Sequence, residues 1–475
     1  MIAPDDSTIH KASFTTSGDD VRQGDANYGS IGRNVPTTGR LHYVPLEVLA
    51  LFYFTNGHFL IFHLQFYLRE RAKLEYDDNH LNHSLNNNST GREDAIQLKA
   101  TTDLIIMLLS LILPACLIAL FMGGLSDVFG RKMLMYLSLT GSTIYSINII
   151  IVVRFSLSVY FVCIGAVLYG LAGYLATMMT SLFSTVADIT EAGDSRSWRM
   201  ILLSFIMFLS NALGNSILGV WIDHVGYLQP LYLSIALCTA SFLVVTLIPE
   251  THRTGKSKYL LKENLYDIKQ GFNFYLAPSE NRTLVGWCLL SFITSFSVEF
   301  TKNIILNMFL LTRPFFWSKT HITLYSAGRV LLSWFVILLA TRCLRRVMSN
   351  ISMTIIAVLS GTVSLLLIAV STNDAMMYIA ALAGVYTQAT GPLMRGFMSN
   401  LATPDQQGAV FSVIDLSEVV ATGVFMMVGG LLYEATLVIF PGFVFIVFAV
   451  VLLCVAAALF IAKRTHDRKT ERRTE

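Results

Sequence analysis

Apolar runs long enough to cross a bilayer recur along the chain, separated by shorter polar segments. About 18 or more mostly apolar residues in a row, folded as an α-helix, cover the roughly 30 Å of bilayer hydrocarbon. Such runs recur from Val44 to Ala462, and their pattern predicts twelve spans. Because backbone groups in lipid must find hydrogen-bond partners within their own segment, we expect helices and no strands. The predicted fold class is an all-α integral membrane protein.

The predicted spans form two sets of six. The spans are 44–68, 102–122, 133–153, 158–183, 200–222 and 228–248, then 284–311, 322–343, 351–372, 375–398, 408–432 and 436–462. Two six-helix halves around a polar connector are typical of transporters built from repeats. The expected parts are a disordered cytoplasmic tail (1–43), a six-helix lobe (44–248), a cytoplasmic central loop (249–283), a second six-helix lobe (284–462) and a basic cytoplasmic tail (463–475).

The distribution of Lys and Arg predicts the orientation. If both termini are cytoplasmic, 23 of the 34 Lys and Arg residues fall on cytoplasmic segments, counting Arg342 at the end of its span, and eight on external ones, as the positive-inside rule requires. Segment 69–101 is then external, and it holds three glycosylation sequons, at Asn82, Asn87 and Asn88. No strong lysosomal sorting signal is visible, so the plasma membrane is favoured over the lysosomal membrane.

Composition narrows the function classes. Hydrophobic residues make up 54% of the chain and charged residues 14%, against about 25% charged in soluble domains. The formal charge of +3, with no basic-aromatic patch, argues against nucleic acid as a partner. The six cysteines lie in or beside apolar runs without a CxxC pair, which favours buried hydrophobes over metal ligands. No ATP-binding Gly-rich motif is present. We expect the lipid bilayer and a small solute as partners, no cofactor and no obligate protein partner.

The most specific local motif lies between the second and third spans, where Gly123 to Lys132 read GGLSDVFGRK. Its glycines allow a tight turn and a close approach of helices. Asp127 is placed to interact with a helix N-terminus or with Arg131, which would latch the two lobes on the cytoplasmic side. The alternative interpretation is a solvated basic turn, which does not by itself account for the Gly and Asp placement.

A second constellation follows the fourth span and contains Asp188, Arg196 and Arg199. Its counterpart in the second half runs from Pro392 to Ser412. Matching positions in the two halves are what a duplicated six-helix unit predicts. We expect Asp188, Arg196 and Arg199 to belong, with Asp127, to a conformational latch.

These motifs resemble those of known transporters. The segment from Gly123 to Lys132 is similar to the signature G-x-L-x-D-x-x-G-R-K of the major facilitator superfamily. Together with residues 186–188, 314–317 and 392–412, it makes most of residues 44–462 resemble the solute carrier family of the proton-coupled folate transporter. The resemblance implies a twelve-helix fold of major-facilitator type, alternating access, and organic, often anionic, solutes.

The chain departs from the folate transporter at positions where the resemblance implies coupling. Tyr174 and Ser204 stand where that relative has acids in its fourth and fifth spans, and Glu299 stands where it has a histidine. Arg395 keeps the arginine of the tenth span, whereas the relative's external-loop cysteines have no counterpart in residues 69–101. Folate is therefore disfavoured as the solute.

Ionisable residues inside the spans are candidates for the site, since each costs about 2.5–3.5 kcal/mol at the bilayer centre. Arg395 is the leading candidate for substrate binding, because a guanidinium can hold a carboxylate or phosphate through paired hydrogen bonds. Its alternative role is a latch to Asp415 and Glu418, which share a helical face. Two such carboxylates repel, so one can hold a proton at neutral pH and serve in coupling, unless Arg395 or Arg329 neutralises it.

Three further groups of residues are weaker candidates. His58 and Gln65 lie on one stripe of the first span, suited either to a cavity wall or to contacts with neighbouring helices. Glu299 shares a face with Lys302 and is either a coupling residue or is simply neutralised by that lysine. Among the aromatic residues, the candidates for stacking on a planar solute are Tyr174 and Tyr386.

The sequence therefore predicts a secondary active or facilitative transporter of a small organic, anionic solute, with protons as the candidate coupling ion for symport. A non-transporting receptor or sensor on the same scaffold remains an alternative. A membrane enzyme is a weaker one, because its spans would need a clustered metal or nucleophile site. We expect no enzymatic activity.

The orientation can be tested by glycan mapping. Asn82, Asn87 or Asn88 should carry a glycan, because only sequons outside the cytoplasm meet the glycosylation machinery. Asn281 and Asn350 also lie in sequons but on predicted cytoplasmic segments, and they should stay bare. Glycosidase treatment of single Asn→Gln variants gives the measurement, and a glycan on Asn281 would contradict the orientation.

Overall fold

The computed structural model describes residues 44–80, 89–190, 194–251, 282–344, 346–401 and 407–474. The chain divides into two units, Met1–Thr38 and Gly39–Glu475, and the first unit lies outside the described residues, as does most of the expected central loop. Every regular element in the described ranges is helical. The predicted all-α fold class is therefore confirmed.

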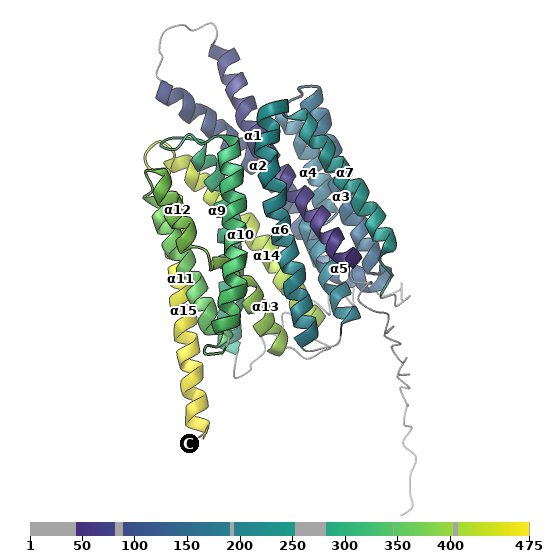
Figure 1. Ribbon diagram of the computed structural model, residues 1–475, viewed down its shortest axis with the longest axis vertical. Coiled ribbons are helices and arrows are strands. Elements are labelled where there is room, and N and C mark those ends of the chain that lie inside the picture. Colours follow the sequence, from purple (N-terminus) through teal and green to yellow (C-terminus); the bar gives the residue numbers. More distant parts are fainter. Residues whose placement is uncertain are drawn as a thin grey trace, which may run out of the picture. The chain divides into compact units, whose positions relative to one another are not determined.

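The described helices fall into the two expected halves (Figure 1). The N-terminal half contains α1 (Val44–His80), α2 (Ser89–Phe129), α3 (Arg131–Arg154), η2 (Val159–Phe161), α4 (Val162–Leu171), α5 (Tyr174–Ile189), α6 (Asp194–Val225) and α7 (Leu228–Leu247). The C-terminal half contains α9 (Arg282–Leu310), α10 (Lys319–Leu344), α11 (Asn350–Ala369), α12 (Asp374–Ala383), η3 (Thr387–Ala389), α13 (Thr390–Leu401), α14 (Gln407–Thr436) and α15 (Phe443–Thr474).

Eleven segments of the described chain are long and apolar enough to cross a membrane. The remaining expected span, the tenth (375–398), is divided among α12, η3 and α13, each of which is too short to cross alone. Taken together, these pieces supply the remaining crossing. The chain is thus a multi-pass integral membrane protein, consistent with the twelve-helix fold.

The fourth and tenth spans are both interrupted near their middle. α4 ends at Leu171 and α5 begins at Tyr174, with φ of +83° at Gly173 and +48° at Tyr174. The left-handed region is costly for a tyrosine, so surrounding packing must hold that conformation. In the other half a single 3-10 turn separates α12 from α13. Interruptions at matching positions are expected of a duplicated unit, and such backbone is tolerated where protein rather than lipid surrounds it.

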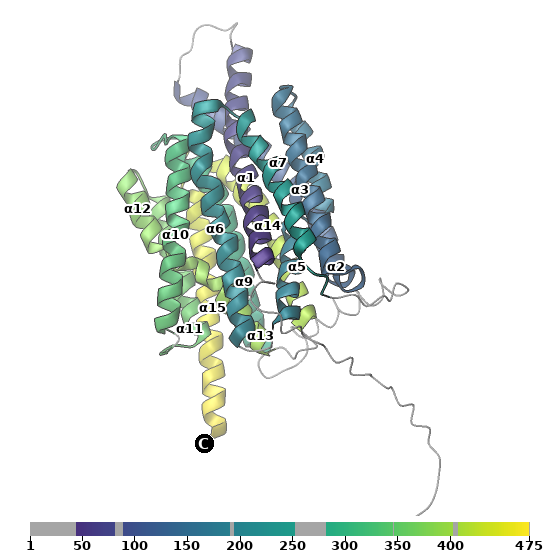
Figure 2. The ribbon, with the colours of Figure 1, turned by 45° about the vertical axis from the view of Figure 1, so that its right-hand side comes forward.

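The two halves meet most extensively through two helix pairs, α2 with α14 and α6 with α10. Figures 1 and 2 both show α6 running beside α10. Each pair contains a glycine at the contact. A Cβ at Gly219 of α6 would collide with Thr323 of α10, and one at Gly430 of α14 would collide with Ile105 of α2. Small residues allow this close backbone approach between membrane helices.

The first two helices extend beyond their predicted spans. α1 continues to His80 and α2 begins at Ser89, so much of the expected external loop 69–101 is helical. The charges that made this segment look like a loop are paired with each other: Arg92 Nη2 lies 2.6 Å from Asp77 Oδ1, between α2 and α1. Ion pairs between two helices allow both helices to continue beyond the membrane. There the sequence is no longer apolar, so run length does not predict the helix.

Candidate functional site

A small cavity of about 60 Å³ lies where α2 and α5 of one half meet α9 and α14 of the other. It is lined by Ile112, Tyr174, Leu175, Ala176, Met179, Phe296, Phe300, Asp415, Glu418, Val419 and Thr422. The lining is apolar and aromatic except for the two carboxylates and two hydroxyls. Residues from both halves thus enclose a site of the kind that transporters place between their repeats.

The cavity is too small for an organic solute in this conformation. A water molecule occupies about 30 Å³ in the liquid, whereas sites for drug-sized ligands measure about 300–1,000 Å³. Binding of a larger solute therefore requires the cavity to widen.

Arg395, Asp415 and Glu418 form a buried group beside the cavity, here called the Arg395 cluster. Arg395 Nη2 of α13 lies 2.6 Å from Glu418 Oε2 and 3.4 Å from Asp415 Oδ1, both on α14. The three side chains are 19%, 18% and 8% exposed for Arg395, Asp415 and Glu418. Two acids share one guanidinium, so the cluster carries one excess negative charge when all three groups are ionised.

Two rings and a hydroxyl hold the Arg395 cluster in place. The guanidinium carbon lies 5.5 Å from the ring centre of Phe183 and 5.2 Å from that of Phe292, within the range of cation–π attraction. Thr180 Oγ1 donates to Asp415 Oδ2 at 3.3 Å. Phe183 and Thr180 belong to α5, so the N-terminal half contacts a charge cluster made by the C-terminal half.

A second buried group, here called the Glu299 cluster, joins α9 to α10. Glu299 Oε2 lies 2.5 Å from Lys302 Nζ, and its Oε1 lies 3.1 Å from Arg329 Nη1. Arg329 Nη2 also donates to Asn303 Oδ1 at 2.6 Å. Glu299 and Lys302 thus form an ion pair, as in one of the two alternatives that the sequence left open for Glu299. Arg329 pairs here and not with the acids of the eleventh span, which Arg395 contacts instead.

The two polar candidates on α1 point to different partners. His58 Nδ1 lies 3.0 Å from Asn211 Nδ2 of α6, within the N-terminal half. Gln65 Oε1 accepts a hydrogen bond of 2.8 Å from Asn307 of α9, which joins the halves. Neither lines the cavity, so the structure gives them contacts with neighbouring helices.

The two aromatic candidates also separate. Tyr174 lines the cavity, directly after the break in the fourth span. Tyr386 lies within the break in the tenth span, between α12 and α13, and its hydroxyl is 3.2 Å from Thr341 Oγ1 of α10. It is buried in a different apolar cluster with Trp334. Of the pair, Tyr174 is placed to contact a solute in the cavity.

Several latch candidates form contacts at the end of the bundle predicted to be cytoplasmic. Arg131 Nε lies 3.2 Å from Asp188 Oδ2, and Glu250 accepts the backbone N–H of Arg131 at 2.8 Å. Arg199 Nη1 lies 2.9 Å from Glu47 Oε1. These contacts join elements of the N-terminal half. The side chains of Asp127 and Arg196, and the sequons at Asn82, Asn87 and Asn88, lie outside the described residues.

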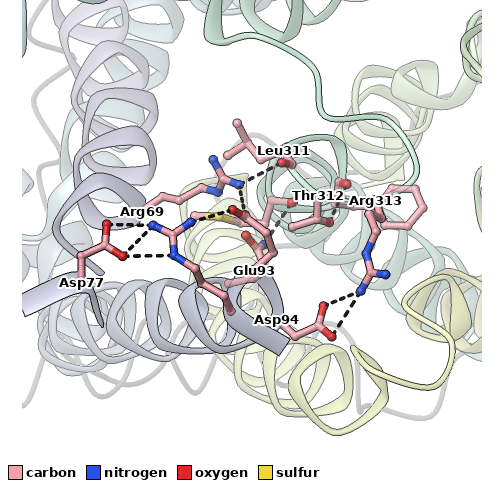
Figure 3. A network of polar contacts seen from close by, with 11 residues as sticks. Arg69, Asp77, Glu93, Asp94, Leu311, Thr312 and Arg313 are labelled. Carbon is pink, nitrogen blue, oxygen red and sulfur yellow. Dashed lines mark hydrogen bonds and ion pairs between the residues drawn. The ribbon is translucent and has the colours of Figure 1, made fainter. Parts of the chain in front are cut away.

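Polar contacts between the halves concentrate at the opposite, predicted outer end, and the sequence did not indicate them. Figure 3 shows Arg69 of α1 donating to Glu93 at 3.0 Å and to the backbone oxygen of Leu311 at 3.1 Å. Arg313 lies 3.3 Å from Asp94 of α2. The contacts of Arg69 with Leu311 and of Arg313 with Asp94 join the two halves at this end of the bundle.

A fully buried amide adds to these contacts. Gln97 Nε2 of α2 donates to the backbone oxygen of Met308 at 3.0 Å. Gln97 lies in a segment with several charged residues, from Arg92 to Lys99, so no sequence signal indicated this contact.

Two six-helix halves with a cavity between them are the architecture of transporters of the major facilitator type. A sequence model described as Major Facilitator Superfamily matches residues 88–321, just under half of the chain. The family resemblance predicted from the motifs is confirmed.

The relatives are transporters by name, not enzymes. The proton-coupled folate transporter of Rattus norvegicus is 26% identical over 352 residues, covering 73% of this chain and 75% of the relative. The lysosomal proton-coupled steroid conjugate and bile acid symporter of Gallus gallus is 24% identical, covering 71% and 74%. The crystal structure of the human organic anion transporter MFSD10 shares the fold, with a TM-score of 0.62, 16% identity, and coverage of 88% of this chain and 99% of that one.

Closure of the outer end by Arg69 can be tested with a cysteine reporter. Leu311→Cys keeps the backbone oxygen that Arg69 contacts, and the side chain is 5% exposed. In a background with the native cysteines replaced by serine, Arg69→Ala should raise labelling by a membrane-impermeant thiol reagent about tenfold, since a hydrogen bond from a charged donor contributes about 1.5–3 kcal/mol.

Arg92→Ala is the matched control for this test. Arg92 pairs with Asp77 and Glu93, both in the N-terminal half, so its loss should leave labelling of the cysteine unchanged. Equal labelling in the Arg69 and Arg92 variants would refute the closure.

Proposed function

We propose that this chain is a proton-coupled symporter of organic anions with a large apolar body, using the Arg395 cluster as the proton site. The observation that carries the proposal is the pairing of two buried carboxylates with one guanidinium at the wall of the central cavity. A net charge is costly inside the bundle. One proton shared by Asp415 and Glu418 removes the excess negative charge of the cluster.

The proposed coupling depends on how the charge of the Arg395 cluster affects the movement of the two halves. The acids line the cavity and Thr180 of α5 contacts Asp415 across the halves. A cluster with a net negative charge is costly to seal away from water and cations, so the charge opposes closure of the interface around it. A protonated cluster is neutral and can be buried in either conformation of the bundle. Proton binding therefore favours the movement that carries the solute.

The cavity lining supports an amphiphilic solute. Phe296, Phe300 and Met179 offer apolar and aromatic surface, and the site provides few hydrogen-bonding groups beyond its two acids and two hydroxyls. A steroid-like body fits this chemistry better than a polar, hydrogen-bonding ring system such as that of folate. Two relatives are named for these two solute classes, and we favour the class of steroid conjugates and bile acids.

We also propose the plasma membrane as the location, with both termini in the cytoplasm. The orientation is supported by the bias of Lys and Arg toward one side of the predicted spans. Surface biotinylation of the expressed chain, compared with its overlap with a lysosomal marker, tests the location. Residence of most of the chain in lysosomes would reject it.

A non-transporting receptor on the same scaffold is the alternative class. Purified protein in proteoliposomes should accumulate labelled cholate, a bile acid, when the outside is at pH 5.5 and the inside at pH 7.4. Binding of cholate without uptake would favour the receptor.

Neutralising either acid should remove the pH dependence of uptake. Glu418→Gln or Asp415→Asn leaves one acid for Arg395, so the cluster is already balanced and no longer needs a proton. The ratio of cholate uptake at pH 5.5 to that at pH 7.4 should fall to about one, while exchange of cholate across the membrane continues. Asp374→Asn is the control, because Asp374, at the start of α12, lies outside the cluster and accepts a hydrogen bond from Trp317. Wild-type pH dependence in both cluster variants would reject the proton site.

The role of Arg395 can be separated from that of a direct solute ligand. Arg395→Ala leaves two buried acids without a cation, and breaking a buried pair costs about 3–5 kcal/mol. We expect lower thermal stability in detergent, restored in part by adding Glu418→Gln. If Arg395 instead holds the anion of the solute, Arg395→Lys should raise the KM for cholate because an ammonium cannot form the paired contact. Normal stability and normal KM in Arg395→Ala would exclude both roles.

A further inference from the structure

The Glu299 cluster contains one more cation than it has anions. Both carboxylate oxygens of Glu299 are occupied, one by Lys302 and the other by Arg329. Within the described ranges, no second carboxylate lies within ion-pair distance of Lys302 or Arg329. The side chains of Lys302 and Arg329 are only 6% and 11% exposed. The cluster therefore buries an excess positive charge, the opposite of the Arg395 cluster.

The two cations also retain unused hydrogen-bond donors. Arg329 uses Nη1 for Glu299 and Nη2 for Asn303, while its buried Nε has no hydrogen-bond partner. Lys302 donates to Glu299 through one of the three protons of its ammonium group. Donors and charge together favour an anionic acceptor at this position, because a buried unpaired charge is strongly unfavourable.

Because Arg329 donates a hydrogen bond to Asn303, its guanidinium lies beside the face of α9 that meets the other half. At 100° per residue, Phe296, Phe300, Asn303 and Asn307 fall within an arc of about 60°. Phe296 and Phe300 line the cavity, and Asn307 contacts Gln65 across the halves. Asn303 follows Phe300 by roughly 4.5 Å along the helix axis. Arg329 therefore lies within about one helical turn of the cavity.

We propose that Arg329 and Lys302 bind the anionic group of the transported solute, a carboxylate or sulfate, while its apolar body occupies the cavity. The planar guanidinium offers adjacent N–H donors that match two oxygens of such a group, and Lys302 adds a point charge. This assignment rests on the proposed symport. It places the anion at the Glu299 cluster and the proton at the Arg395 cluster.

The charges of the two clusters account for one-to-one coupling. With no solute and no proton bound, the excess charges of the clusters, one negative and one positive, cancel within the C-terminal half. With one proton and one monovalent anion bound, each cluster is neutral. Binding of only one of them leaves a net charge in the bundle, which disfavours its movement through the closed state.

The test measures cholate binding to the purified full chain by thermal stability and compares it with methyl cholate, the uncharged ester. Arg329→Gln and Lys302→Gln each leave a balanced pair with Glu299, so both variants should fold with a melting temperature close to that of the wild type. Arg329→Gln should raise the Kd for cholate at least tenfold, and Lys302→Gln by a smaller factor. The Kd for methyl cholate should stay the same.

Two further variants sharpen the result. Glu299→Gln frees both cations and should bind cholate more tightly than the wild type, a gain that a purely structural role would not produce. Arg342→Gln removes an exposed arginine at the other end of the same helix and should leave the Kd unchanged. Equal cholate Kd values in the wild type, Arg329→Gln and Lys302→Gln, or no cholate-dependent stabilisation of the wild type, would overturn the proposal.

Replacing sodium gluconate in the buffer by sodium chloride tests whether a free inorganic anion, instead of the anionic group of the solute, binds at Arg329 and Lys302. Competition between chloride and cholate in the wild type would support one shared anion position. Arg329-dependent stabilisation by chloride, with unchanged cholate binding in Arg329→Gln, would show a site for inorganic anions only and reject the assignment. Because binding is measured without uptake, a failure of pH-dependent transport would reject the proton site but not this anion position.

Discussion

The cost of an unbalanced charge inside a helical bundle governs the arrangement of this protein. The Arg395 cluster contains two acids and one base, and the Glu299 cluster contains one acid and two bases. Neither partial exposure nor hydrogen bonds fully offset the cost of the remaining charge in each cluster. A structure stabilised only by packing would have no reason to keep odd numbers of buried charges. In the proposed symport, a bound proton corrects the imbalance at the Arg395 cluster and the anionic group of the solute corrects that at the Glu299 cluster.

Both clusters lie wholly within the C-terminal half, and this affects how the halves can move. Rocking of one half against the other need not separate Arg395 from Glu418, or Glu299 from Arg329. The polar contacts that must break at one end of the bundle include the hydrogen bonds from Arg69 to Leu311 and from Gln97 to Met308, and the ion pair of Arg313 with Asp94. The buried ion pairs can thus persist through the cycle while the interface opens and closes.

The sequence predicted those features that depend on one segment at a time. Apolar run length located the spans, and spacing along one helix paired Glu299 with Lys302. It did not predict that α1 continues to His80, because charged residues paired across helices look the same as charged residues in a loop. Nor could it choose between Arg329 and Arg395 as the partner of the span 11 acids. That choice depends on the tertiary placement of the side chains, which brings Arg329 to Glu299 at 3.1 Å and Arg395 to Glu418 at 2.6 Å.

The two halves share an architecture but divide the chemistry. In the N-terminal half, charged pairs such as Glu47 with Arg199 lie near helix ends, and its interior is held by neutral contacts, including Tyr53 with Tyr169 at 2.7 Å. Its contribution to the cavity is shape, from Tyr174 and its neighbours after the break in the fourth span. Charge enters the cavity from the other half alone. A duplicated fold can therefore let one half select the body of a solute while the other responds to its charge and to the proton.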